Sequence, residues 1–128
     1  MSNIALIVNN EPIWQSFVES QLAKSEFRVD RATSILSALT KVQQSHYDLV
    51  IVGSPLDTPA SIQTLAQLIR TRPSQRVMIA SSQFTAAEAI LAFEAGAINY
   101  IEKDFDSDKL SDTITDTLAR KPGTEMML

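Results

Sequence analysis

The chain has 128 residues, of which 45% are hydrophobic and 20% charged, the composition of one ordinary globular domain. It contains no cysteine, which excludes disulfides, thiolate metal sites and cysteine nucleophiles. A net charge of −4 without any basic run argues against a direct nucleic-acid surface. The apolar runs are too short to span a membrane and no signal pattern opens the chain, so we expect a soluble, cytoplasmic protein without membrane contact.

Five short apolar runs along the chain predict buried β-strands. The first lies in the stretch NIALIVNNEP of residues 3–12, and it ends abruptly at two asparagines, an acid and a proline. The predicted strands span residues 4–8, 27–31, 49–52, 77–80 and 98–101.

The segment after the first strand predicts an amphipathic helix. Pro12 stands where a first helical turn begins. Trp14 falls outside the apolar stripe, so we expect it to be partly exposed, either as an anchor for a partner or as a cover for the helix end. The apolar stripe itself consists of Ile13, Phe17, Val18 and Leu22.

Two more helices are predicted around the third strand. Thr33 is placed to cap one of them, and Thr58 followed by Pro59 is a strong start signal for the other. Their predicted apolar faces are Ile35, Leu36, Leu39 and Val42 in the former and Ile62, Leu65, Ala66 and Ile69 in the latter.

The C-terminal third predicts the last two helices. Thr85 with Glu88 has the pattern of a capping box, and Gly96 supplies the stop signal for that helix. The final helix is expected over residues 106–119, with Leu110, Ile114 and Leu118 buried. We expect a domain of residues 1–120, followed by a flexible tail or linker over residues 121–128, which contain both Pro and Gly.

Strands that alternate with helices predict an α/β protein with a parallel sheet covered on both faces. In such a sheet the functional crevice lies beyond the carboxyl ends of the strands. The residues to consider are therefore 9–11, 53–55, 81–82 and 103–104.

At these positions the chain resembles the receiver domain of bacterial response regulators, a flavodoxin-like family typified by CheY. The likeness extends from residue 3 to about residue 119 and includes IALIVNNEP, YDLVIVGSPL, RVMIASS and AFEAGAINYIEKDF. The last match is the most specific, because Tyr100, Lys103 and Phe105 fall in register with residues 95–97. The resemblance implies a doubly wound (βα)5 fold with strand order 2-1-3-4-5 and a role in two-component signal transduction.

Members of this family take a phosphoryl group from a histidine kinase onto an aspartate after the third strand. That aspartate and two acids after the first strand hold Mg²⁺, while a hydroxyl and a lysine contact the phosphoryl oxygens. The family also has an aromatic switch residue, which corresponds to Tyr100, and usually a proline where this chain has Asp104. We expect a trans peptide bond before Asp104, as for any residue other than proline. By position, the resemblance places the phosphorylation pocket at Asn9, Asn10, Gly53, Ser81 and Lys103.

Three of those residues do not suit the family's chemistry. Gly53 has no side chain that could attack phosphorus, and Asn9 and Asn10 offer neutral amides to a cation that prefers carboxylates. We therefore expect a degenerate pseudo-receiver with no catalytic residue, no bound metal or cofactor and no enzyme activity.

Without clustered carboxylates, Lys103 needs another counter-charge. We expect this to be Asp104, Asp57 or an asparagine oxygen. With no phosphoryl group to respond to, Tyr100 is expected to keep a single rotamer.

Such a protein would signal through its surface. On the face formed by the fourth helix, fifth strand and fifth helix, we expect Leu91 and Ile98 to be exposed beside Tyr100. We expect this face to bind a protein partner of a signalling pathway, and a homodimer through it is the alternative. A like-charged stripe on the last helix is either a solvated face or a strip for a basic partner, and consists of Asp108, Asp112 and Asp116.

Two other functions stay open at this stage. Asp57 could accept a phosphoryl group in place of an acid at position 53, although an acid before Thr58 is ordinary at a helix start. Alternatively, the vacated pocket could bind a small ligand through its amides, Ser54, Ser81 and Lys103.

Two enzyme classes are disfavoured. The only histidine, His46, precedes the third strand and so lies at the opposite sheet edge from Ser81 and Ser82, which excludes a serine hydrolase. The NNEP turn has no glycine and carries a negative charge, which does not suit a phosphate-binding loop.

Overall fold

The computed structural model describes residues 3–53 and 55–120. Ser54 and the predicted tail at 121–128 lie outside the described residues. Strands and helices alternate throughout, and every predicted element is present. The strands are β1 (Asn3–Val8), β2 (Phe27–Ala32), β3 (Leu49–Val52), β4 (Arg76–Ser81) and β5 (Asn99–Glu102). The helices are α1 (Pro12–Lys24), α2 (Ile35–Gln44), α3 (Pro59–Thr71), α4 (Ala86–Ala95) and α5 (Ser107–Ala119).

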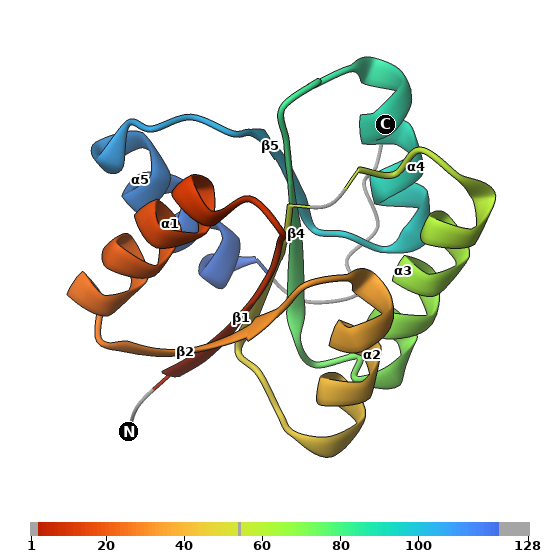
Figure 1. Cartoon of the computed structure of the whole chain (residues 1–128), viewed down its shortest axis with the longest axis horizontal. Helices are drawn as coiled ribbons and strands as arrows, with labels where there is room; N and C mark the ends of the chain where they lie inside the picture. Colours follow the sequence, from red (N-terminus) through yellow and green to blue (C-terminus); the bar gives the residue numbers. More distant parts are fainter. Residues whose placement is uncertain (1–2, 54, 121–128) are drawn as a thin grey trace.

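The strands form one parallel sheet in the order β2-β1-β3-β4-β5, which confirms the expected fold. Helices α1 and α5 cover one face, and α2, α3 and α4 cover the other (Figure 1). Val8 pairs with Val52, and Ser81 pairs with Glu102. The carboxyl ends of the inner strands and of β5 therefore meet at one sheet edge, where the crevice residues follow.

The sheet is buried on both faces, which explains the continuous apolar runs of its central strands. Successive side chains point to opposite faces, so one strand supplies both cores. In β1, Leu6 and Val8 pack with the α2–α4 layer, whereas Ala5 and Ile7 pack with the α1–α5 layer. No helix within the described residues has the length and apolar character needed to cross a membrane.

Helix α1 is rotated relative to the prediction. Trp14 is only 2% exposed and forms a buried row with Val18 and Leu22, while Ile13 is 77% exposed. The expectation of a partly exposed Trp14 and a buried Ile13 was therefore wrong. A large indole removes more apolar area from water than an isoleucine, and the row at 14, 18 and 22 places that indole against the sheet.

The start of α2 also differs from the prediction. Ser34, not Thr33, caps this helix, and its Oγ accepts from the N–H of Ser37 at 3.1 Å. Because the helix starts one residue later, Leu36 points to solvent and Ala38 is buried in its place.

The other helix signals were predicted correctly. Thr58 caps α3 with Pro59 in the first turn, and Gly96, with φ of 109°, ends α4. Only glycine adopts this left-handed conformation without strain. Asp106 caps α5 by accepting from the N–H of Lys109 at 3.1 Å.

Candidate functional site

Three of the predicted pocket residues come together beyond the ends of β1, β3 and β5. A β-carbon placed on Gly53 would lie 3.3 Å from Cγ of Asn9 and 3.3 Å from Cε of Lys103. The space beside Gly53 is therefore filled by the amide of one neighbour and the aliphatic stem of the other. Asn10 is exposed, so only Asn9 of the asparagine pair faces this cluster.

The buried Asn9 organises the loop between β1 and α1. Its Oδ1 accepts from the N–H of Glu11 at 3.0 Å, and its Nδ2 donates to the carbonyl oxygen of Glu11 at 3.4 Å. This is the local side-chain-to-backbone bonding by which asparagine stabilises tight turns. The same bonds place Glu11 at the mouth of the crevice.

Lys103 is paired with Glu11 across the crevice. Its Nζ lies 2.5 Å from Oε1 of Glu11, and the lysine side chain is 6% exposed whereas the glutamate is 53% exposed. The three predicted counter-charges were wrong: Asp104 instead pairs with Lys109 at 3.2 Å, and Asp57 is exposed before α3. The stem of Lys103 runs over Gly53 toward the β1–α1 loop, and Glu11 is the acid of that loop. The peptide bond before Asp104 is trans, like every other bond in the described residues.

Acidic side chains do not gather in this crevice. Among the described residues, no three His, Cys, Asp or Glu side chains are placed to hold a metal ion together. Beside Gly53 lie the amide of Asn9 and the side chain of Lys103, whose ammonium group pairs with Glu11.

The hydroxyl at the end of β4 bonds to its own loop. Oγ of the buried Ser81 accepts from the N–H groups of Gln83 and Phe84, both at 3.1 Å. Phe84 has a φ of 48°, which is uncommon for a large residue. The serine therefore stabilises a turn that holds the Phe84 side chain against Tyr100.

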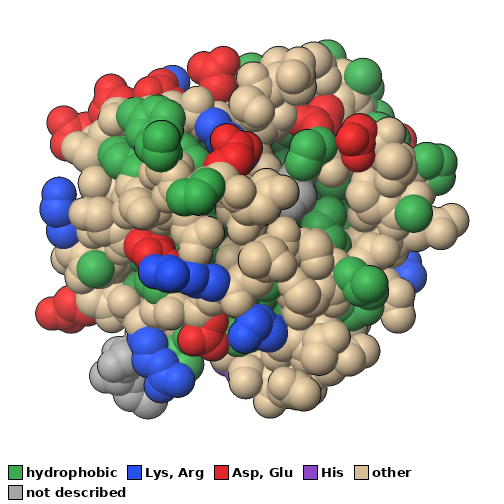
Figure 2. Space-filling view, in the orientation of Figure 1, with side chains coloured by type: hydrophobic (Ala, Val, Ile, Leu, Met, Phe, Trp, Pro, Cys, Tyr) green, Lys and Arg blue, Asp and Glu red, His purple; other side chains and the backbone are tan. Residues whose placement is uncertain are grey.

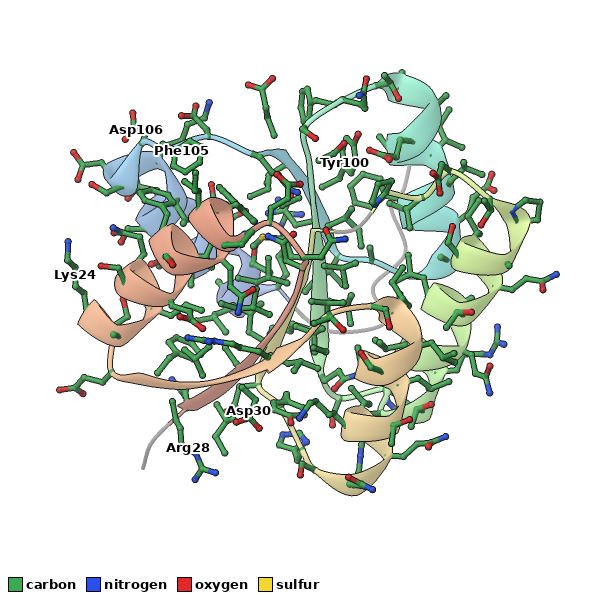
Figure 3. The ribbon with its side chains drawn as sticks, viewed as in Figure 1. Lys24, Arg28, Asp30, Tyr100, Phe105 and Asp106 are labelled. Carbon is green, nitrogen blue, oxygen red and sulfur yellow. The ribbon has the colours of Figure 1, made fainter. Side chains whose placement is uncertain are left out.

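The side chain of Tyr100, from β5, contacts the start of α4 (Figure 3). Its hydroxyl accepts from the N–H of Thr85 at 3.0 Å and donates to Oε1 of Glu88 at 2.7 Å. Its ring stacks on Phe84, with ring centroids 5.3 Å apart and planes 8° apart. The predicted capping box is thus half formed: Thr85 accepts from the N–H of Glu88, but the tyrosine hydroxyl takes the return bond.

This network shifts two pKa values. Burial alone raises the pKa of the Glu88 carboxyl, but hydrogen bonds from Ser81, Tyr100 and the N–H of Leu56 outweigh burial and lower it overall. The pKa of Tyr100 is raised, first by burial and then by its hydrogen bond to Glu88. The carboxylate form of Glu88 is thus stabilised by its partners.

The expectation that Leu91 and Ile98 are exposed on the α4–β5–α5 face was wrong for Ile98, which is buried, and Leu91 is only partly exposed. Ile98 is 8% exposed, because it precedes β5 and its N–H bonds to the carbonyl of Val77 inside the sheet. Leu91 is half-buried. Instead, Ile90 and Phe84 are exposed, at 57% and 49%. The sequence could not indicate Phe84, because its exposure depends on the turn held by Ser81.

Charge is distributed very unevenly over the chain. Residues 86–119 carry eight acidic and two basic side chains, whereas residues 3–85 carry six acidic and seven basic ones. Figure 2 shows acidic side chains gathered at the upper left, over the start of α5, with basic side chains lower, near β2. The predicted stripe is exposed on α5, with Asp116 paired to Arg120 at 2.8 Å.

The fold and the position of the crevice define a doubly wound, flavodoxin-like α/β domain, because a parallel sheet of order 2-1-3-4-5 carries its polar residues at the carboxyl ends of β1, β3, β4 and β5. The model of the response regulator receiver domain family matches residues 5–115. The chain belongs to this family, and its place is in two-component signalling.

Curated relatives and solved structures agree with this assignment. The transcriptional regulatory protein ZraR of Klebsiella oxytoca is 30% identical over 114 residues, which cover 89% of this chain and 26% of the relative. The response regulator ArlR of Staphylococcus aureus is 26% identical, over 95% of this chain and 55% of the relative. The chain thus spans about a quarter to a half of these proteins.

Two solved structures show the same architecture. A response regulator from Thermotoga maritima superimposes with a TM-score of 0.84 at 23% identity, covering 94% of this chain and all of that one. HP1043, an orphan response regulator of H. pylori, superimposes with a TM-score of 0.79 at 25% identity, covering 91% and 97%.

Proposed function

We propose that this chain is a pseudo-receiver: a non-catalytic, phosphorylation-independent receiver domain that acts in the cytoplasm by binding a protein partner. The observation that carries the proposal is the packing at Gly53. The position after β3 offers no nucleophile, and the stem of Lys103 and the amide of Asn9 fill the space beside it.

The residues present do not fit a Mg²⁺ ion. Mg²⁺ requires several oxygen ligands in octahedral geometry, usually with one or two carboxylates. Here the carboxylate of Glu11 is already paired with the ammonium group of Lys103, at 2.5 Å. A divalent cation would have to compete with this internal cation, and the amide of Asn9 is already bonded to the backbone.

The same packing weighs against the two alternatives. Asp57 is exposed in the loop before α3 and makes no ion pair with Lys103, whose ammonium group would neutralise a phosphoryl group. A small ligand in the crevice would have to displace Lys103 from Glu11 and from the surface of Gly53. Both changes carry a free-energy cost that a pre-formed site would avoid.

Intact mass spectrometry after incubation with acetyl phosphate and Mg²⁺ tests the proposal. We expect no adduct of one phosphoryl group on the chain. The matched variant Asp57→Asn assigns any adduct that does form: loss of the adduct in this variant would establish the displaced acceptor and overturn the proposal. In this proposal, the partner binds to the α4–β5–α5 face.

A further inference from the structure

A small pocket lies between β5 and the first turns of α5, outside the crevice described above. It has a volume of about 190 Å³. Residues from four separate segments line it, among them Trp14, Phe84, Tyr100, Glu102, Asp104 and Lys109. The pocket therefore joins the β4–α4 loop, β5 and α5, and it reaches inward to the buried Trp14 of α1.

The walls of the pocket combine an aromatic surface with negative charge. The stacked rings of Phe84 and Tyr100 contribute one side. Glu102 is exposed and has no ion-pair partner among residues 3–53 and 55–120. Asp104 forms an ion pair with Lys109, which is itself largely exposed. Aromatic rings beside carboxylates are the surroundings that a guanidinium group prefers, because it stacks on rings and donates paired hydrogen bonds to carboxylates in a planar geometry.

Trp14 adds an independent observation. Its indole is almost fully buried and lines the pocket, and its Nε1–H has no acceptor in the part of the chain that the structure describes. Buried polar groups without a partner are rare in folded proteins. A carbonyl oxygen brought in by a bound peptide segment is one group that would satisfy this donor.

We propose that this pocket receives an arginine side chain from a basic segment of a partner protein. The inference rests on the proposed function, because it names the kind of partner that the interaction module binds. Charge complementarity selects the partner: residues 86–119 carry a net charge of −6, so a basic segment is attracted to the face around the pocket. A symmetric dimer through the same face would bring two acidic surfaces together.

Trp14 is the only tryptophan and lies at the pocket, so its fluorescence reports occupancy. The probe is a short capped alanine–arginine peptide, titrated into the full chain at low salt, with an alanine–glutamate peptide as its charge-reversed control. We expect a saturable change in Trp14 fluorescence with the arginine peptide and none with the glutamate peptide. Absence of saturation at millimolar arginine peptide would overturn the proposal.

Two charge-neutralising variants distinguish peptide binding in the pocket from nonspecific attraction to the acidic surface. Glu102→Gln removes a carboxylate of the pocket, whereas Asp112→Asn removes one from an exposed position on α5 that does not line it. We expect Glu102→Gln to weaken the peptide by about tenfold, the size of one charged hydrogen bond, and Asp112→Asn by less than about twofold. Equal losses of peptide affinity in the two variants would overturn the proposal, because they would show that the peptide binds to the acidic surface in general.

Two further results have distinct meanings. A phosphoryl adduct in the mass experiment would overturn the proposed function while the fluorescence titration still measures the pocket. A dimer in sedimentation that Glu102→Gln dissociates would identify a second copy of this chain as the occupant, and would overturn the partner proposal.

Discussion

The ammonium group of Lys103 lies 2.5 Å from the carboxylate of Glu11, across a separation of 92 residues in the chain. This pair joins the β1–α1 loop to the β5–α5 loop, and the lysine stem covers Gly53 on the way. The crevice thus contains both a cation, the ammonium group of Lys103, and its counter-charge, the carboxylate of Glu11.

Removing the acid of this pair should destabilise the fold. Glu11→Gln leaves the nearly buried ammonium group of Lys103 without its counter-charge, and we expect a loss of about 1–2 kcal/mol in the free energy of unfolding. Urea denaturation measures the loss. The matched control is Glu19→Gln, which breaks the more exposed pair with Arg31 and should cost less than about 1 kcal/mol. Equal costs would show that burial of Lys103 does not matter.

Restoring the acids should restore cation binding only when all are restored together. Gly53→Asp alone places a carboxylate against Lys103, and we expect an ion pair with that lysine and no Mg²⁺-dependent rise in Tm. Adding Asn9→Asp and Asn10→Asp should produce a Mg²⁺-dependent rise in Tm, because clustered carboxylates repel one another until a cation binds. Thermal unfolding with and without Mg²⁺ measures both variants. A Mg²⁺ response in the unmodified chain would contradict the proposed function.

The tyrosine hydroxyl should stabilise the start of α4. Tyr100→Phe removes the acceptor for the N–H of Thr85 and a donor to Glu88, so we expect a cost of about 1–2 kcal/mol and faster hydrogen exchange at Thr85. Phe84→Ala is the matched control, because it removes the stacked ring and keeps both hydrogen bonds. If the exchange at Thr85 increased only in Phe84→Ala, the hydroxyl would have no capping role.

The stability of the chain should depend on pH through Glu88. Its pKa is lowered by folding, so its contribution is complete above the reference value of 4.5 and disappears as the pH falls through the lowered folded pKa. The difference in unfolding free energy between the unmodified chain and Glu88→Gln should therefore be constant near neutral pH and shrink in acid. Denaturation at a series of pH values measures this difference. A difference that grew in acid would mean that folding raises the pKa of Glu88.

Self-association through the α4–β5–α5 face, if it forms, should strengthen with salt, because salt screens the net −6 charge of residues 86–119. Leu91→Arg and Ile90→Arg should both abolish it and leave the fold intact, as measured by sedimentation velocity and circular dichroism. Ile90→Arg should disturb the fold less than Leu91→Arg, because Ile90 is exposed and Leu91 is half-buried. A dimer that persists in both variants would use another surface.

What the sequence determined by itself is local and periodic. Apolar runs, capping residues such as Thr58 and the stop at Gly96 act within a few residues, so the order of strands and helices could be predicted. The identity of the crevice residues was equally accessible, because parallel strands deliver the residues after them to one edge. The absence of a side chain at Gly53 is a property of the sequence alone.

Only the tertiary structure decided which groups meet. Lys103 pairs with Glu11 because two loops approach each other across the sheet edge, and no local pattern encodes that distance. The same holds for the Tyr100 hydroxyl in the start of α4 and for the rotation of α1 that buries Trp14. In each case the outcome follows from which long-range contacts bury the most apolar area or satisfy the most polar atoms, and those contacts exist only once the chain has folded.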